Sequence, residues 1–96
     1  MITEIALLKI RDQQSEAFET AFSEAQKIIA NMKGYKYHEL QKCIEEEDKY
    51  LLLVQWQTLE HHTEGFRKSN EYQEWKKLLH HFYDPFPTVE HYKKVF

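Results

Sequence analysis

Six histidines are the side chains of this sequence best suited to acid–base chemistry near neutral pH. They are His38, His61, His62, His80, His81 and His91. Four of them form two adjacent pairs in segments that read as helices. Neighbours on a helix point about 100° apart, so at most one member of each pair faces the interior. We therefore expect His61, His80 and His81 to be solvated.

His62 and His91 are the candidates for a catalytic base. His62 falls on the helix face that carries Leu59 and Phe66, and by strand alternation His91 shares a face with Val89 and Val95. Removal of a proton from a phenol or an activated C–H needs a base that titrates near neutrality, which an imidazole supplies. The alternative for either residue is a half-buried structural histidine that is hydrogen-bonded to the backbone.

Aromatic residues concentrate in the same stretch and could bind a flat ligand. The substrate-binding candidates are Trp56, Phe66, Tyr72, Trp75 and His38. Aromatic rings stack on aromatic ligands, and the Tyr72 hydroxyl can donate a hydrogen bond to an oxyanion. At helical spacing such residues are also ordinary core, so a packing role for each remains open.

Metal and nucleotide sites lack their sequence signatures. The chain has no HExxH motif and no facial-triad spacing of histidine and carboxylate, and Cys43 is its only cysteine. Gly34 and Gly65 stand alone, so no glycine-rich phosphate loop is present. We expect neither a metal nor another cofactor.

Composition indicates one small globular domain spanning residues 1–96. The chain is 42% hydrophobic, 15% aromatic and 30% charged, with a net charge of −3. Lysines and arginines are interspersed with acids, which argues against a nucleic-acid partner. The longest apolar run, at 50–54, is too short for a membrane span, and charged residues interrupt any signal-peptide pattern near the N-terminus. We expect a cytoplasmic protein.

Alternation of apolar residues predicts four strands, at residues 2–10, 34–44, 49–57 and 89–95. The acidic segment 45–48 reads as a solvated hairpin connection between the second and third strands.

Apolar spacing of three and four predicts a long helix between the first two strands, capped by Asp12 and ending before Gly34. Thr58 is expected to cap a short helix that runs to about residue 68. Ser69 or Asn70 is expected to cap the next helix, which ends at the prolines at 85 and 87. The order β-α-β-β-α-α-β predicts an α+β fold, a ferredoxin-like split βαβ unit with a mostly antiparallel sheet.

The first and third strands are apolar on both faces. Ala6 and Leu8 oppose Ile5 and Leu7, and the run 51–54 does the same. A strand with one solvent-exposed face should alternate between apolar and polar residues. A chain of this length has too few helices to cover both faces of a sheet. We therefore predict a homodimer in which a second copy covers the outer face.

The C-terminal half resembles the antibiotic biosynthesis monooxygenase (ABM) domains. The resemblance rests on a strand that ends in a tryptophan, a capped helix with a histidine pair, a second capped aromatic helix and a closing strand: Trp56, Thr58, Glu60, His61, His62, Phe66, Ser69, Tyr72, Trp75, His91 and Tyr92. The first strand and acid-rich helix fit as well, so the resemblance covers nearly the whole chain.

The resemblance implies a dimeric α+β barrel, two ferredoxin-like units joined sheet to sheet, with a pocket between sheet and helices in each. It also implies oxidation of aromatic polyketides, anthrones or quinols by O2 without metal or flavin. Some relatives degrade haem with an Asn in the first strand and a Trp and a His on later helices. Here the first strand has no Asn, Gly65 and Phe66 fall near the position of that Trp, and Trp75 or Lys76 falls near that of the His, which argues against haem degradation.

Two functions follow from this sequence. The first is a cofactor-independent monooxygenase that oxidises a small aromatic or quinol compound with O2. The alternative is a non-enzymatic dimeric module that binds a hydrophobic ligand, because a fold alone does not determine activity.

Overall fold

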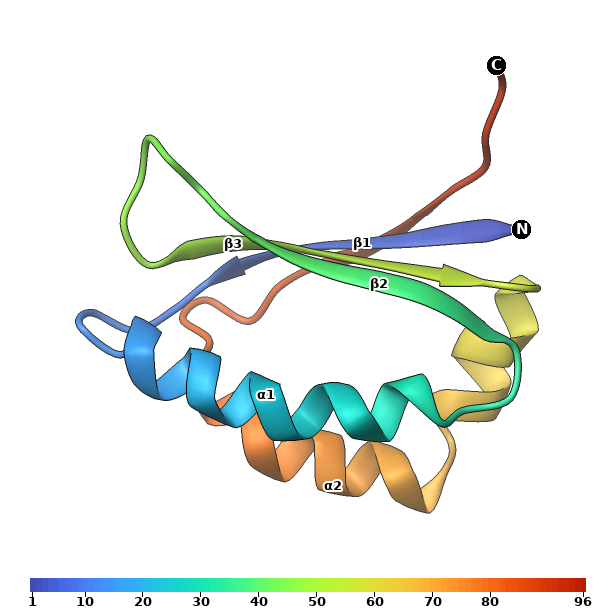
Figure 1. Cartoon of the computed structure of the whole chain (residues 1–96), viewed down its shortest axis with the longest axis horizontal. Helices are drawn as coiled ribbons and strands as arrows, with labels where there is room; N and C mark the ends of the chain where they lie inside the picture. The colour runs from blue at the N-terminus through green and yellow to red at the C-terminus, as the bar shows by residue number, and fades with distance from the viewer.

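The chain folds into two layers, an antiparallel sheet and the helices packed on one of its faces (Figure 1). The computed structural model describes all residues, 1–96. In chain order the elements are β1 (Ile2–Lys9), α1 (Ser15–Ala30), β2 (Tyr35–Lys42), β3 (Lys49–Trp56), the π-helical η1 (His61–Phe66), α2 (Asn70–Leu79), the 3₁₀ turn η2 (His80–Phe82) and β4 (Val89–Tyr92). The strand order is β2-β3-β1-β4. The predicted ferredoxin-like α+β arrangement is confirmed.

The core lies between the sheet and the helices. Along β1 and β3 every second side chain is buried, and Ala6, Leu8, Leu52 and Val54 face the helices as the alternation indicates. Phe18 of α1 is fully buried and packs at 5.0–6.2 Å against four aromatic rings that come from α1, β3 and the segment after α2. This aromatic cluster packs the helical layer against the sheet.

The outer face of the sheet carries apolar side chains that no helix covers. Ile5 lies opposite Leu53 and Leu7 opposite Leu51 in the β1–β3 register, so the four form one patch on the two central strands. Leu7 is 57% exposed. The prediction that these strands are apolar on both faces is confirmed.

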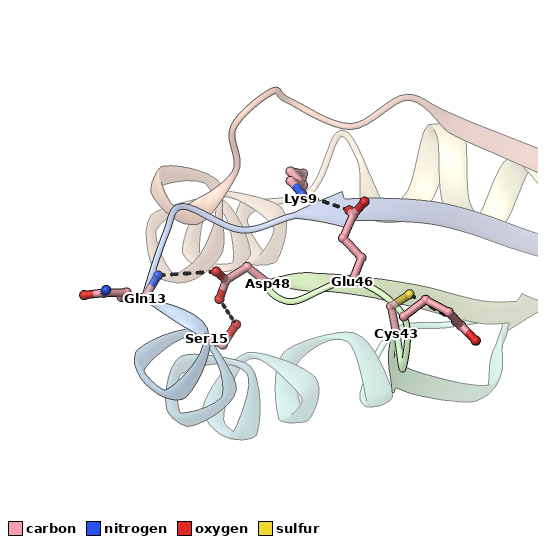
Figure 2. A network of polar contacts seen from close by, with 7 residues as sticks. Lys9, Gln13, Ser15, Cys43, Glu46 and Asp48 are labelled. Atoms are coloured by element: carbon pink, nitrogen blue, oxygen red, sulfur yellow. Dashed lines mark hydrogen bonds and ion pairs between the residues drawn. The ribbon is translucent and has the colours of Figure 1, made fainter.

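The start of α1 differs from the prediction that Asp12 caps it. The chain turns before the helix, with Gln13 at a φ of 62°, and the helix begins at Ser15. Asp48, from the β2–β3 connection, accepts hydrogen bonds from the Ser15 hydroxyl at 2.5 Å and the Gln13 N–H at 3.4 Å (Figure 2). The acidic connection is therefore not simply solvated, since it ties the hairpin to the beginning of α1.

The last strand is also shorter than the predicted range 89–95. β4 pairs with β1 from Ala6 opposite Val89 to Thr3 opposite Tyr92, and β1 itself begins at Ile2. Beyond Tyr92 the chain has almost no partner strand left and runs out past the sheet (Figure 1).

The aromatic helix begins as predicted and ends earlier than the prolines indicate. The Ser69 hydroxyl accepts a hydrogen bond from the Tyr72 N–H at 3.1 Å, which confirms Ser69 as the cap. The α-helix ends at Leu79 and continues as the 3₁₀ turn η2. None of the helices combines the length and apolar composition needed to cross a membrane.

Candidate active site

A cavity of about 360 Å³ lies between the inner face of the sheet and the segments that follow β3. Its floor is apolar and comes from Ala6, Leu8 and Leu52. Its lining also includes Tyr72 and Trp75 of α2 and a group of neighbouring polar residues, Glu4, His62 and Arg67, which form its polar end. The volume falls in the range typical of small-molecule sites, roughly 300–1,000 Å³.

The wall formed by η1 and α2 is aromatic. The Phe66 ring meets Tyr72 at 5.2 Å and Trp75 at 5.6 Å, both nearly edge to face. The Ser69 cap starts α2 directly after η1 and so places Tyr72 and Trp75 beside Phe66. Burial raises the pKa of the Tyr72 hydroxyl, which therefore stays protonated near neutrality and can donate a hydrogen bond.

The polar end of the cavity holds a buried carboxyl, Glu4. This side chain is only 6% exposed, although it belongs to a strand whose other inward residues are apolar. The Trp56 indole N–H donates to Glu4 Oε1 at 2.9 Å, and His62 Nε2 lies 3.4 Å from the same oxygen. Glu4 also lies directly opposite His91 in the β1–β4 register.

His62 joins these groups into one network. Its Nδ1 lies 2.8 Å from His91 Nε2, and its ring stacks on Trp56 with 5.5 Å between centroids and 17° between planes. The stack on one side and contacts at both ring nitrogens fix the orientation of the imidazole. The four residues therefore form a chain of contacts, Trp56–Glu4–His62–His91, that leads from the buried indole to the edge strand β4.

Burial governs the protonation of the two central groups. It raises the pKa of the Glu4 carboxyl from 4.5 to about 7, against the opposing effects of the Trp56 hydrogen bond and the Arg67 charge. Burial, with smaller contributions from Arg67 and His91, lowers the pKa of His62 from 6.5 to about 3. His62 is therefore neutral near pH 7, and its 3.4 Å contact with Glu4 is not an ion pair at that pH.

Arg67 supplies positive charge at this end. It follows η1, lines the cavity and lies largely in solvent, while its backbone N–H donates to the His62 carbonyl at 2.9 Å. The guanidinium lowers the pKa of Glu4, His62 and His91 by its charge. A negative charge that develops on a bound compound would be stabilised in the same field.

The structure brings most of the predicted site residues together. His62, Phe66, Tyr72 and Trp75 line the cavity. His91 does not line it but contacts His62 directly.

Two predicted ligand-binding residues lie elsewhere. Trp56 is fully buried behind Glu4 and His62, where it supports the polar end rather than the lining. His38 lies on β2 away from the cavity lining, and its ring nitrogens contact the Tyr35 hydroxyl at 2.5 Å and the Gln26 side-chain oxygen at 2.9 Å. Both of its nitrogens are thus taken up within the domain.

Among the cavity residues that the sequence did not single out are three with acidic, basic or imidazole side chains: Glu4, Arg67 and His80. Glu4 had a signal, because it shares the inward set of its strand with Ala6 and Leu8. His80 was expected to be solvated. It is half-buried instead, with its ring 4.9 Å from Phe86, and burial lowers its pKa.

No group of three or more histidine, cysteine or acidic side chains is arranged to hold a metal ion. What the arrangement offers is a cavity with mostly hydrophobic lining residues and a carboxyl whose pKa burial raises to about 7, so that it can take up or release a proton near neutrality. Such a space suits an aromatic compound with an acidic C–H or O–H.

Comparison with known proteins agrees with this geometry. The sequence model described as "Antibiotic biosynthesis monooxygenase" matches residues 1–78. The uncharacterised protein YczJ of Bacillus subtilis is 61% identical over 95 residues, which cover 99% of this chain and 100% of that protein.

Comparison with solved structures agrees with the family match. A protein from Bordetella bronchiseptica described as an antibiotic biosynthesis monooxygenase superposes with a TM-score of 0.94 at 32% identity, covering 99% of this chain and 97% of the other. SnoaB, a cofactor-independent oxygenase from Streptomyces nogalater, shares the fold with a TM-score of 0.77 at 15% identity, covering 99% of this chain and 93% of the other. The family match and the close relatives together establish that the chain belongs to the antibiotic biosynthesis monooxygenase family.

Proposed function

We propose that this protein is a monooxygenase that uses O2, without a cofactor, to oxidise a small aromatic or quinol compound bound in the cavity. The observation that carries the proposal is the meeting of an aromatic slot with a single buried, proton-exchanging end. Membership of the family and the shared fold with a cofactor-independent oxygenase support it.

The reaction begins with removal of a proton from an acidic C–H or O–H of the compound. For an anthrone-type methylene, the C–H electron pair stays on the ring system as a carbanion. One electron passes to O2, and the two radicals combine into a C–O bond. The resulting peroxide takes a proton and loses water, so that CH2 and O2 become C=O and H2O. The protein needs to supply a base, a dry slot and stabilisation of negative charge.

The cavity residues match these needs. Phe66 and Trp75 offer faces and edges on which a planar compound can lie. The Tyr72 hydroxyl and the Arg67 guanidinium are the groups placed to stabilise a phenolate or enolate.

Oxygen uptake tests the proposal. Purified protein with a chelator present should consume O2 with an anthrone or hydroquinone at a rate that saturates with substrate. Val89→Phe, which fills space in the cavity lining, should abolish the uptake, while Val95→Phe at an 82% exposed position should leave it unchanged. Binding of ring compounds without any uptake would contradict the proposal and leave a ligand-binding module.

We further propose that two copies pair through the apolar patch on the outer face of the sheet, formed by Ile5, Leu7, Leu51 and Leu53. An apolar patch across two central strands is the kind of surface that self-association removes from water.

Sedimentation at micromolar concentration should give twice the 11.7 kDa chain mass. Leu7→Lys should give the monomer, and Ile44→Lys, in the β2–β3 connection, should remain dimeric. A wild-type monomer would refute the pairing.

A further inference from the structure

We propose that Glu4 is the catalytic base of this cavity and that His62 and His91 form a proton relay from Glu4 to the edge of the sheet. The inference rests on the proposed function and deepens it, because it assigns the base to a carboxylate that sequence analysis did not single out. It rests on the position of Glu4 in the cavity lining and on the unbroken contacts Glu4–His62–His91.

Geometry favours Glu4 over the two histidines as the group that meets the substrate. Glu4 lines the cavity at its polar end, whereas His91 contacts only the far nitrogen of His62. His62 also lines the cavity, but its Nδ1 is hydrogen-bonded to His91 and its Nε2 lies 3.4 Å from Glu4 Oε1. A carboxylate has lone pairs beyond the one that accepts the Trp56 N–H, so it can take a further proton.

The electrostatic surroundings agree with this assignment. Several titratable or polar groups lie around Glu4 on the elements packed against it: Trp56 on β3, His62 on η1, Arg67 after η1, Tyr72 on α2, Tyr83 after η2 and His91 on β4. Burial raises the pKa of the carboxyl to about 7, against the lowering effects of the Trp56 hydrogen bond and the Arg67 charge, and that value suits a base near neutral pH. Because the pKa of His62 is lowered, its ring does not retain a second proton near pH 7 and can pass a proton received on one nitrogen out through the other.

The relay balances in protons. At the start Glu4 is a carboxylate, His62 carries its proton on Nδ1 and donates to His91 Nε2, and His91 carries one on Nδ1. The substrate proton moves to Glu4 and the electron pair stays on the substrate. Glu4 then passes its proton to His62 Nε2, His62 passes the Nδ1 proton to His91 Nε2, and His91 releases its Nδ1 proton to water. The reverse sequence returns a proton for the peroxide and restores the starting tautomers.

The relay has an outlet because of the place of His91 in the fold. β4 is an edge strand of the sheet, and His91 is only half-buried, in contrast to Glu4 and His62. Without such an outlet a proton held by Glu4 would exchange only through the cavity mouth, which a bound compound covers.

The test separates proton removal from oxidation. Anthrone is incubated with the protein in D2O without O2, and deuterium entry at its methylene is followed by NMR above the protein-free rate. Glu4→Gln keeps the size of the side chain and an acceptor for Trp56, and should lower the exchange by about 10²- to 10⁴-fold while anthrone still binds. The control Glu74→Gln changes an exposed carboxylate on α2, one residue before Trp75, and should exchange like wild type.

His91→Phe tests the relay. The oxidation is neutral in protons, so this variant should keep its oxygen uptake. Its deuterium exchange should fall, because the abstracted proton returns to the carbon it left. Exchange at the wild-type rate in His91→Phe would overturn the relay.

Other outcomes assign failure to one proposal or the other. Wild-type exchange or oxygen uptake in Glu4→Gln would overturn Glu4 as the base while the monooxygenase function stands. Binding of anthrone without exchange by the wild type would also overturn it. Exchange without oxygen uptake in the wild type would support Glu4 and refute the monooxygenase function.

Discussion

Replacement of Glu4 by Gln should remove a loss of stability that the wild type suffers as pH rises to neutrality. In the unfolded chain this carboxyl ionises near pH 4.5, and in the folded protein burial delays its ionisation to about pH 7. Between these values the unfolded state has lost a proton that the folded state still holds, so the free energy of unfolding of the wild type falls as pH rises. An amide does not ionise, and the variant lacks this loss.

The magnitude follows from the shift. A rise from 4.5 to about 7, at about 1.4 kcal/mol per unit, amounts to about 3 kcal/mol. No discount for solvent screening is needed, because Glu4 is only 6% exposed. The difference in free energy of unfolding between Glu4→Gln and wild type should therefore grow by about 3 kcal/mol between pH 4.5 and pH 7.5, in favour of the variant, and level off above that.

Urea unfolding at a series of pH values measures this difference. Comparison at each pH cancels the titration of all other groups, and equal protein concentrations cancel any contribution from association. Glu74→Gln serves as the control and should show no such slope, because that side chain lies in water. A difference between Glu4→Gln and wild type that stays constant from pH 4.5 to pH 8 would refute the buried, neutral carboxyl.

Two further substitutions probe the surroundings of the site. Gly34→Ala should lower the free energy of unfolding by more than about 1 kcal/mol, because Gly34 has a φ of +85° and an added methyl group would overlap the His61 ring. The control Gly65→Ala, whose methyl group would meet its nearest neighbour at 3.8 Å, should unfold at wild-type urea concentrations or slightly higher. Equal losses of stability in the two variants would contradict this expectation. Arg67→Gln should raise the pKa of Glu4 further, because the guanidinium charge lowers it, and a carbon-13 carboxyl titration that shows no change or a decrease would refute the role of that charge.

Local patterns predicted the elements well, and long-range contacts account for the errors. The alternation of Ala6 and Leu8 with Ile5 and Leu7 placed β1 correctly, because period two is a property of the strand alone. The start of α1 could not be found in the same way. No side chain caps the helix, and the carboxylate that holds its first residue is Asp48, 33 residues from its partner Ser15 in the chain, so no nearby residue signals it.

The candidate site was predictable in its aromatic part and only partly in its polar part. Helical spacing indicated that His62, Phe66 and Trp75 face inward, and all three line the cavity. Glu4 was missed because a lone carboxylate in a strand usually points to water, and its partner Trp56 is 52 residues away. His80 was missed because the segment after the helix folds back against it, with Tyr83 and Phe86 at 5.6 and 4.9 Å from its ring, and helical spacing does not indicate such contacts.

Isotope labelling tests the central claim most directly. Wild-type protein is supplied with anthrone and ¹⁸O2 in ordinary water with chelator present, and the product is analysed by mass spectrometry. A monooxygenase of the proposed kind should give a product with one ¹⁸O atom, formed at a rate that depends on the protein and falls in Glu4→Gln. A product that carries only oxygen from water, or one formed equally fast without the protein, would contradict the account.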